Sequence, residues 1–163
     1  MKMITELNNI AAIFSVFHDG RITAYSRTGD TIRLTVEIKY LARRVKEDYN
    51  SFSLCLHEVT KLSFRTWPNI VGAQPVLIEN GEPFLGTKME ILSGEVKDGS
   101  IQIACNQANS SLDFCGGELY LLCTGATVSD PSGKEYSLDE LGKICQEYWD
   151  EWSNKSKKAK QEA

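Results

Sequence analysis

The chain has 163 residues, of which 42% are hydrophobic, 25% charged and 9% aromatic. These proportions exclude collagen, a disordered chain, a coiled coil and a cysteine-framework toxin. The formal net charge of −4 argues against a general nucleic-acid binder. We expect a single β-rich domain over residues 1–152, followed by a disordered lysine-rich tail over residues 153–163.

The first part of the chain predicts a three-strand meander. The apolar run from Ile10 to Phe17 is far shorter than the roughly 20 residues of a membrane helix and lacks the flanks of a signal peptide. We therefore interpret this run as a strand and expect a cytoplasmic protein. Turns at Asp19-Gly20 and Gly29-Asp30 then lead to a strand from Thr31 to Tyr40, in which apolar and polar residues alternate.

Alternation of period two continues through the middle of the chain. Asp98-Gly99 predicts a tight hairpin and Asn80-Gly81 a second one, while a break near Ser93-Gly94 suggests a bulge. Arg43 and Arg44 fall in a predicted loop. We count eight or nine candidate strands within residues 11–128. The clearest alternating runs are Phe52–Leu56, Leu62–Phe64, Ile101–Cys105 and Leu119–Cys123.

The period changes to three or four residues near the end, which predicts a helix over residues 138–152. Ser137 and Glu140 form a capping box at its start. The predicted fold is mainly β, an antiparallel sandwich or a strongly curved sheet, with one C-terminal α-helix. The alternative is an α+β helix-grip, in which a curved sheet wraps the last helix and leaves a ligand cavity.

Three residues are candidates for ligand binding or catalysis: His18, His57 and Cys115. His18 precedes a turn, His57 ends a strand, and Cys115 is followed by two glycines. Cys55, Cys105 and Cys123 lie in apolar runs and are expected to be buried, reduced thiols. Two distant histidines and scattered carboxylates do not make a metal site, and no cofactor motif is present, so we expect neither metal nor cofactor.

The predicted helix carries a candidate partner-binding surface. Residues 135–151 contain six acids and one base, a net charge of −5, and Trp149 lies at the edge of the apolar stripe. An acidic surface with Trp149, Glu147, Asp150 and Glu151 would suit a basic protein partner, although the simpler interpretation is the solvated face of an amphipathic helix. Nucleic-acid binding through Arg43, Arg44 and the lysine tail is disfavoured, because Glu47 and Asp48 follow at once.

The stretch Phe17-His18-Asp19-Gly20-Arg21-Ile22, with the strands Phe52–Leu56 and Val59–Phe64, resembles small bacterial β-rich families. These families are uncharacterised or immunity-like proteins of polymorphic toxin systems. The resemblance covers roughly residues 13–105 and leaves out the final helix and the lysine tail. It implies a non-catalytic protein that binds a cognate toxin, and it assigns no functional residues.

The sequence leads to two functional expectations. The first is a non-catalytic protein-interaction module, immunity-like in character. The alternative is a small-ligand-binding β protein or hydrolase, with a pocket in the curved sheet that holds His18, His57 or Cys115. No membrane partner is expected, and the oligomeric state stays open because a free edge strand could pair two copies.

Overall fold

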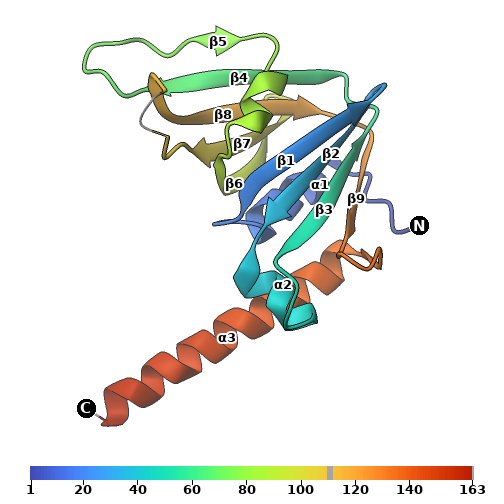
Figure 1. The fold of residues 1–163 in the computed structure, drawn as a ribbon, viewed down its shortest axis with the longest axis vertical. Helices are drawn as coiled ribbons and strands as arrows, with labels where there is room; N and C mark the ends of the chain where they lie inside the picture. Colours follow the sequence, from blue (N-terminus) through green and yellow to red (C-terminus); the bar gives the residue numbers. More distant parts are fainter. Residues whose placement is uncertain (110–111, 163) are drawn as a thin grey trace.

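The computed structural model describes residues 1–109 and 112–162, in which one ten-stranded antiparallel sheet is accompanied by three α-helices and a short 3-10 helix (Figure 1). The strand order is β10-β9-β3-β2-β1-β6-β7-β8-β4-β5. The strands are β1 (Arg21–Thr28), β2 (Thr31–Glu37), β3 (Ser51–His57), β4 (Lys61–Pro68), β5 (Leu77–Ile78), β6 (Glu90–Lys97), β7 (Ser100–Asn106), β8 (Phe114–Leu122), β9 (Gly125–Ser129) and β10 (Glu135–Tyr136). The helices are α1 (Leu7–Val16), α2 (Lys39–Val45), η1 (Glu82–Gly86) and α3 (Leu138–Glu162).

The sheet bends back on itself, because strands near its two ends are continuous in the chain. β8 runs into β9 through a two-residue link, and β3 runs into β4 through residues 58–60. At this corner the Thr60 N–H donates to the Leu122 carbonyl at 2.9 Å, and the Thr124 N–H donates to the His57 carbonyl at 3.0 Å. Apolar residues from both halves of the sheet join one buried core. The predicted mainly β fold with a strongly curved sheet is confirmed.

Two of the predicted hairpins are present as expected. Gly29-Asp30 joins β1 to β2, and Asp98-Gly99 joins β6 to β7. Asp98 and Gly99 have φ angles of 52° and 75°, the left-handed values that this turn needs. The register of β6 against β7 shifts between Ile91 and Ser93, which is the bulge that the sequence suggested.

The apolar run from Ile10 to Phe17 forms the later part of helix α1 and its C-cap residue, Phe17, so the predicted first strand is wrong. Four large apolar residues share one helical face, because successive members are three, one and three positions apart: Ile10, Ile13, Phe14 and Phe17. Each of them is fully buried. Helix α1 packs on β6 and β7 and also contacts α3. In the sequence, a helix buried along a broad face is a nearly continuous apolar run, and so is a buried strand. The two cannot be distinguished by periodicity over so short a stretch, which is why the prediction was wrong.

Gly94 allows α1 to lie directly on β6. The Ser15 hydroxyl donates to the Gly94 carbonyl at 2.9 Å and accepts from the Gly94 N–H at 3.2 Å. A Cβ atom on Gly94 would overlap the Ala11 carbonyl oxygen and would lie 2.7 Å from Phe14 Cβ. The close approach of helix and strand therefore requires glycine at this position.

Two further predictions fail in the middle of the chain. Arg43 and Arg44 lie on helix α2 rather than in a loop, because Leu41 and Ala42 are buried and turn this segment into a short amphipathic helix. Asn80-Gly81 does not close a hairpin. The Gly81 N–H donates to the Leu62 carbonyl at 2.8 Å, and the chain then enters η1, whose early proline favours a helical start.

The final helix is capped as predicted but is longer. The Ser137 N–H donates to Glu140 Oε2 at 2.7 Å, and the Glu140 N–H donates to Ser137 Oγ at 3.1 Å. The helix continues to Glu162, so most of the tail predicted as disordered is helical; Ala163 lies outside the described residues. Residues 153–162 contain no glycine or proline and are rich in lysine, a good helix former.

The helix-grip alternative required the curved sheet to wrap the last helix. In the structure, the sheet does not wrap α3. It packs mainly on α1 and α2, and its last turns project away from the rest of the chain (Figure 1). The helix that lies against the curved sheet is α1. The core position of a helix-grip fold is therefore taken by the first helix.

A buried aspartate fixes the turn that leads into α3. Asp130 is 5% exposed and accepts hydrogen bonds from the Ser132 N–H at 2.8 Å, the Ser132 hydroxyl at 2.6 Å, the Lys134 N–H at 3.2 Å and the Tyr136 hydroxyl at 2.8 Å. Burial alone would raise the pKa of Asp130, but the hydrogen bonds from Ser132, Tyr136 and the backbone outweigh it and lower the pKa below its ordinary value.

Candidate functional site

His18 lies in the turn after α1, against helix α3. Its Nδ1 atom is 2.9 Å from the Ser15 carbonyl oxygen, and its ring stacks on Trp149 with the centroids 5.6 Å apart. The Tyr40 hydroxyl donates to the His18 carbonyl at 2.8 Å. Tyr40 also packs on Tyr148, with a centroid separation of 4.6 Å. His18 is thus part of an aromatic contact between three helical segments.

The other two candidates lie elsewhere in the fold. His57 ends β3, where its Nε2 atom is 3.2 Å from Thr127 Oγ1. Cys115 is exposed on β8, and its thiol donates to the Trp67 carbonyl at 3.5 Å. Each of His18, His57 and Cys115 has its own local partners, and the structure does not bring them together. They therefore do not form a nucleophile with an adjacent base.

Residues 1–109 and 112–162 contain no cluster of three or more His, Cys, Asp or Glu side chains that could hold a metal ion. None of the helices in that part of the chain combines the length and the apolar character that crossing a bilayer requires.

The cysteines differ in exposure, and this difference predicts an outcome in thiol labelling. Cys55, Cys105 and Cys123 are buried, as the sequence indicated, whereas Cys115 is exposed. Burial raises the pKa of Cys105 to about 12 and that of Cys123 to about 11. Cys145 is intermediate in exposure and burial raises its pKa, so a disulfide reagent at about pH 8 should react fastest with Cys115, more slowly with Cys145, and with the three buried thiols only after denaturation. Cys115→Ser should remove the fast phase and Cys55→Ser should leave it; a fast phase that survives Cys115→Ser contradicts the assignment.

The predicted partner surface on α3 is partly engaged within the chain. Arg44 donates from Nη1 to Glu151 at 2.7 Å and from Nη2 to the same carboxylate at 2.9 Å. This hydrogen bonding lowers the pKa of Glu151 below its usual range. Arg44 Nη2 also lies 3.9 Å from Glu147, while Asp150 accepts from Gln146 at 2.8 Å. The charge of Arg44 is thus balanced by α3, and not by Glu47 and Asp48 as the sequence suggested.

Trp149 of this surface is packed inward, against His18 and Tyr40. The neighbouring Trp152 is the exposed one, with 56% of its surface accessible. A partner-binding role for Trp149, Glu147, Asp150 and Glu151 stays a prediction. Any partner that used the acidic residues would compete with Arg44 for two of them.

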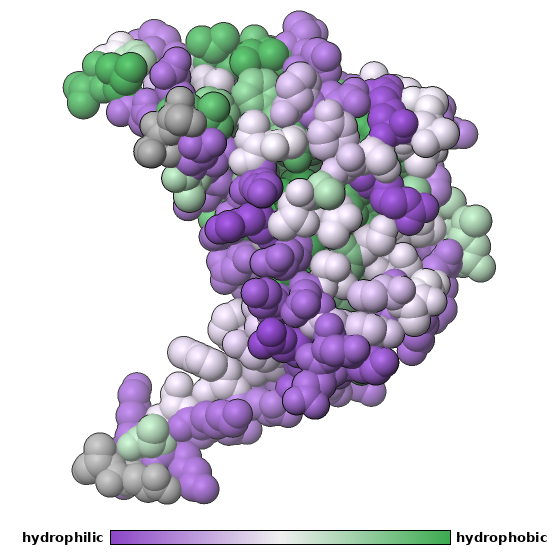
Figure 2. Space-filling view, in the orientation of Figure 1, coloured by the Kyte–Doolittle hydropathy of each residue, from purple (hydrophilic) through white to green (hydrophobic). Residues whose placement is uncertain are grey.

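The strongest exposed apolar feature is the segment that follows β4, residues 69–77, which we call the apolar arm; its last residue, Leu77, is the first residue of β5. Four of its side chains are more than half exposed: Ile70 (64%), Val71 (104%), Val76 (56%) and Leu77 (56%). Figure 2 shows apolar surface at the end of the molecule where Figure 1 places this segment. Exposed apolar side chains are common singly, but a group of them is typical of an interaction site.

The base of the apolar arm is held to the sheet. The Thr66 N–H donates to the Val76 carbonyl at 3.0 Å, and the Val76 N–H donates to the Thr66 hydroxyl at the same distance. The Asn69 side chain donates to the Leu112 carbonyl at 3.1 Å. Next to the arm, β5 pairs with β4 on one side only and forms the edge of the sheet in the described residues.

Sequence reasoning did not identify the apolar arm. It treated Val76 to Ile78 as one side of the predicted hairpin at Asn80-Gly81 and assigned no role to Ile70-Val71. The available signal was the placement of two aliphatic pairs, Ile70-Val71 and Val76-Leu77, in a short segment that also contains asparagine, glycine and proline. Such a segment cannot form a regular buried strand, so its apolar residues remain without a core to enter.

Comparison with known proteins adds no relative: no protein-family model matches the chain, and no curated protein or solved structure shows significant similarity to it.

Proposed function

We propose that this chain is a non-catalytic protein-interaction module that docks its partner on the apolar arm. The observation that carries the proposal is the group of four exposed apolar side chains at one end of the molecule, Ile70, Val71, Val76 and Leu77. A partner that covered these side chains would gain roughly 25 cal/mol of binding free energy for each Å² of apolar surface removed from water. Hydrophobic anchors of this kind provide much of the binding energy at protein interfaces.

The adjacent sheet edge supports the same interpretation. β5 is only two residues long and has β4 as its neighbour on one side. The backbone groups on its other side are available to an extended segment of a partner, a common mode of recognition. Apolar side chains beside an open edge would supply the affinity, and the backbone pairing would supply the register.

The partner implied by the resemblance is a protein toxin, which this chain would bind and inactivate. The separation of His18, His57 and Cys115 favours binding over catalysis, because these residues lie in unconnected parts of the structure. Asp150 and Trp152 on α3 are both exposed and offer a second contact for a basic partner.

The test is a pairwise binding measurement with purified proteins encoded beside the gene for this chain. Ile70→Ser/Val71→Ser should weaken binding by at least about tenfold, because it removes two anchors from the interface. The matched control Leu92→Ser changes an exposed apolar residue outside the arm and should leave the affinity within about twofold. Both variants should unfold at the same denaturant concentration as the wild type. Equal affinity of the arm variant and the wild type would refute the proposal.

A further inference from the structure

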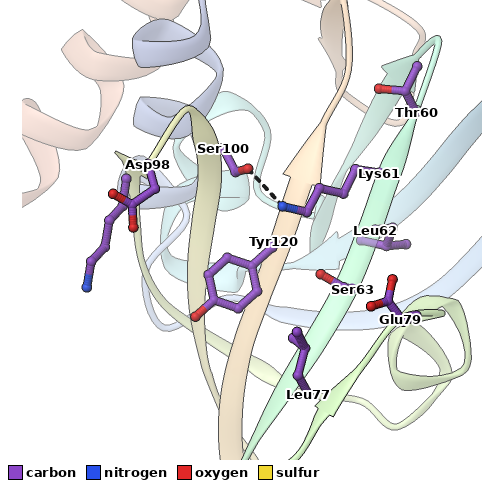
Figure 3. A pocket seen from close by; sticks show the side chains of 10 residues that line it. Thr60, Lys61, Leu62, Ser63, Leu77, Glu79, Asp98, Ser100 and Tyr120 are labelled. Atoms are coloured by element: carbon purple, nitrogen blue, oxygen red, sulfur yellow. Dashed lines mark hydrogen bonds between the residues drawn. The ribbon is translucent and has the colours of Figure 1, made fainter.

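A groove lies on the outer face of β4, β7 and β8, and nothing described so far assigns a role to it. Its volume is about 540 Å³, which falls within the size range of small-molecule sites. Lys61, Ser100 and Tyr120 form the floor, as Figure 3 shows. Leu77 and Glu79 border one side, and the β6–β7 turn borders the other.

A lysine ammonium group is held in place at the floor of this groove. Lys61 Nζ donates to Ser100 Oγ at 3.1 Å and lies 5.8 Å from the centroid of the Tyr120 ring. Ser100 is itself buried, so its hydroxyl is fixed by the hairpin that carries it. Among the residues that the structure describes, no carboxylate lies within 4 Å of Lys61 Nζ. An ammonium group has three donors, so hydrogen-bonding capacity and charge remain for an anion.

The aromatic ring beside this lysine is fixed as well. The Tyr120 hydroxyl donates to Glu118 Oε2 at 2.8 Å, and Glu118 Oε1 accepts from the Trp67 indole at 3.2 Å. Burial raises the pKa of Tyr120, and the hydrogen bond to Glu118 raises it further, so the ring stays neutral beside an anion. The ring and the Leu77 side chain give the groove apolar surface next to the lysine.

The charges at the rim limit the charge of the ligand. Glu79 lies on one border of the groove, and Lys97 and Asp98 lie on the other, so that together with Lys61 the lining carries two positive and two negative charges. The lining therefore has no excess of positive charge, and its two carboxylates disfavour a phosphate or another multiply charged anion more than a single carboxylate. A ligand with one negative charge and an apolar body matches the floor and the borders together.

We propose that this groove binds a small organic carboxylate with an aromatic or branched aliphatic body, its carboxylate on Lys61 and its body against Tyr120 and Leu77. This site does not depend on the proposed function, although Leu77 borders the groove and also belongs to the apolar arm. Lys61 and Tyr120 lie outside the apolar arm, so changes at these two residues test the groove without altering Ile70 or Val71.

The test is a titration of the isotope-labelled full chain, followed by the amide signals of Lys61, Ser100 and Tyr120. The probes are phenylacetate, 2-phenylethanol and acetate, which carry ring and carboxylate, ring alone and carboxylate alone. Phenylacetate should give saturable shifts with a Kd on the order of 1 mM, as expected for so small a ligand. Acetate and 2-phenylethanol should each bind at least about tenfold more weakly.

Variants separate the two contacts. Lys61→Met should weaken phenylacetate binding by at least about tenfold, whereas the control Lys157→Met, on the projecting end of α3, should not change it. Tyr120→Phe keeps the ring and should bind as the wild type does, whereas Tyr120→Ala should not bind. The absence of saturable shifts, equal binding of acetate, or unchanged binding by Lys61→Met would each overturn the proposal. Spectra of every variant should retain the wild-type dispersion, which separates loss of the site from loss of the fold.

Discussion

Gly94→Ala should lower the free energy of unfolding by about 3 kcal/mol, the upper part of the usual range for overpacking. The added methyl group would overlap the Ala11 carbonyl oxygen and press on Phe14, so α1 would have to move off β6. That movement would also lengthen the two hydrogen bonds between Ser15 and Gly94. Urea unfolding monitored by circular dichroism measures the change.

Gly142→Ala is the matched control for this experiment. Gly142 lies in α3, and a Cβ atom there would meet nothing within 4 Å. Alanine has the higher helix propensity, so this variant should gain up to about 1 kcal/mol of stability. If Gly94→Ala unfolded at the same urea concentration as the wild type, the close contact between α1 and β6 would be disproved.

Asp130→Ala should cost about 3 kcal/mol of stability, because it removes the acceptor of several hydrogen bonds at once. The Tyr136 side chain is nearly fully buried, so its hydroxyl would be left without its partner. Asp113→Ala is the control, since Asp113 is exposed and its loss should change stability by less than about 0.5 kcal/mol.

The same aspartate should contribute to the pH dependence of stability. The pKa of Asp130 is lower in the folded chain than its ordinary value of 3.8, so the unfolded chain takes up the proton first as the pH falls. The stabilisation is therefore complete above about pH 5 and is lost as the pH falls through the folded pKa. Urea midpoints between about pH 6 and pH 3 should fall less steeply for Asp130→Ala than for the wild type. Parallel curves for the two proteins would contradict this assignment.

The strands and their tight turns could be predicted from the sequence because their signals are local. Alternation in β2 and the left-handed turn at Asp98-Gly99 each depend on residues that are adjacent in the chain. The cap of α3 is local in the same way, since Ser137 and Glu140 are three residues apart. Interactions between residues close in the sequence were therefore sufficient to predict the strand, the turn and the helix cap.

Helix α1 and the end of α3 were misjudged for opposite reasons. The broad apolar face of α1 hid its helical spacing, since burial by β6, β7 and α3 tolerates apolar residues at most positions. The last turns of α3 carry no large apolar residue, yet their propensity is enough to extend a helix that is already nucleated.

The candidate sites depend on contacts that no local rule can supply. Arg44 meets Glu151 across 107 positions, although two acidic residues stand much closer to it in the sequence. Lys61, Ser100 and Tyr120 come from three strands, and they meet only because β8 lies between β4 and β7. Strand order and register decide which polar residues share a face, and the sequence alone did not provide them.

The packing of α1 on the middle of the sheet has a consequence for how the chain acquires its structure during synthesis. Helix α1 leaves the ribosome before the strands of this sheet, and β6 and β7, against which it packs, end only at Asn106. Until those strands have been translated, Ile13, Phe14 and their apolar neighbours have no surface to cover them. Contacts between such distant parts of a chain form slowly, because a long loop must close first. The apolar face of α1 therefore stays exposed until β7 has been translated, and for that time it is a surface to which a chaperone can bind.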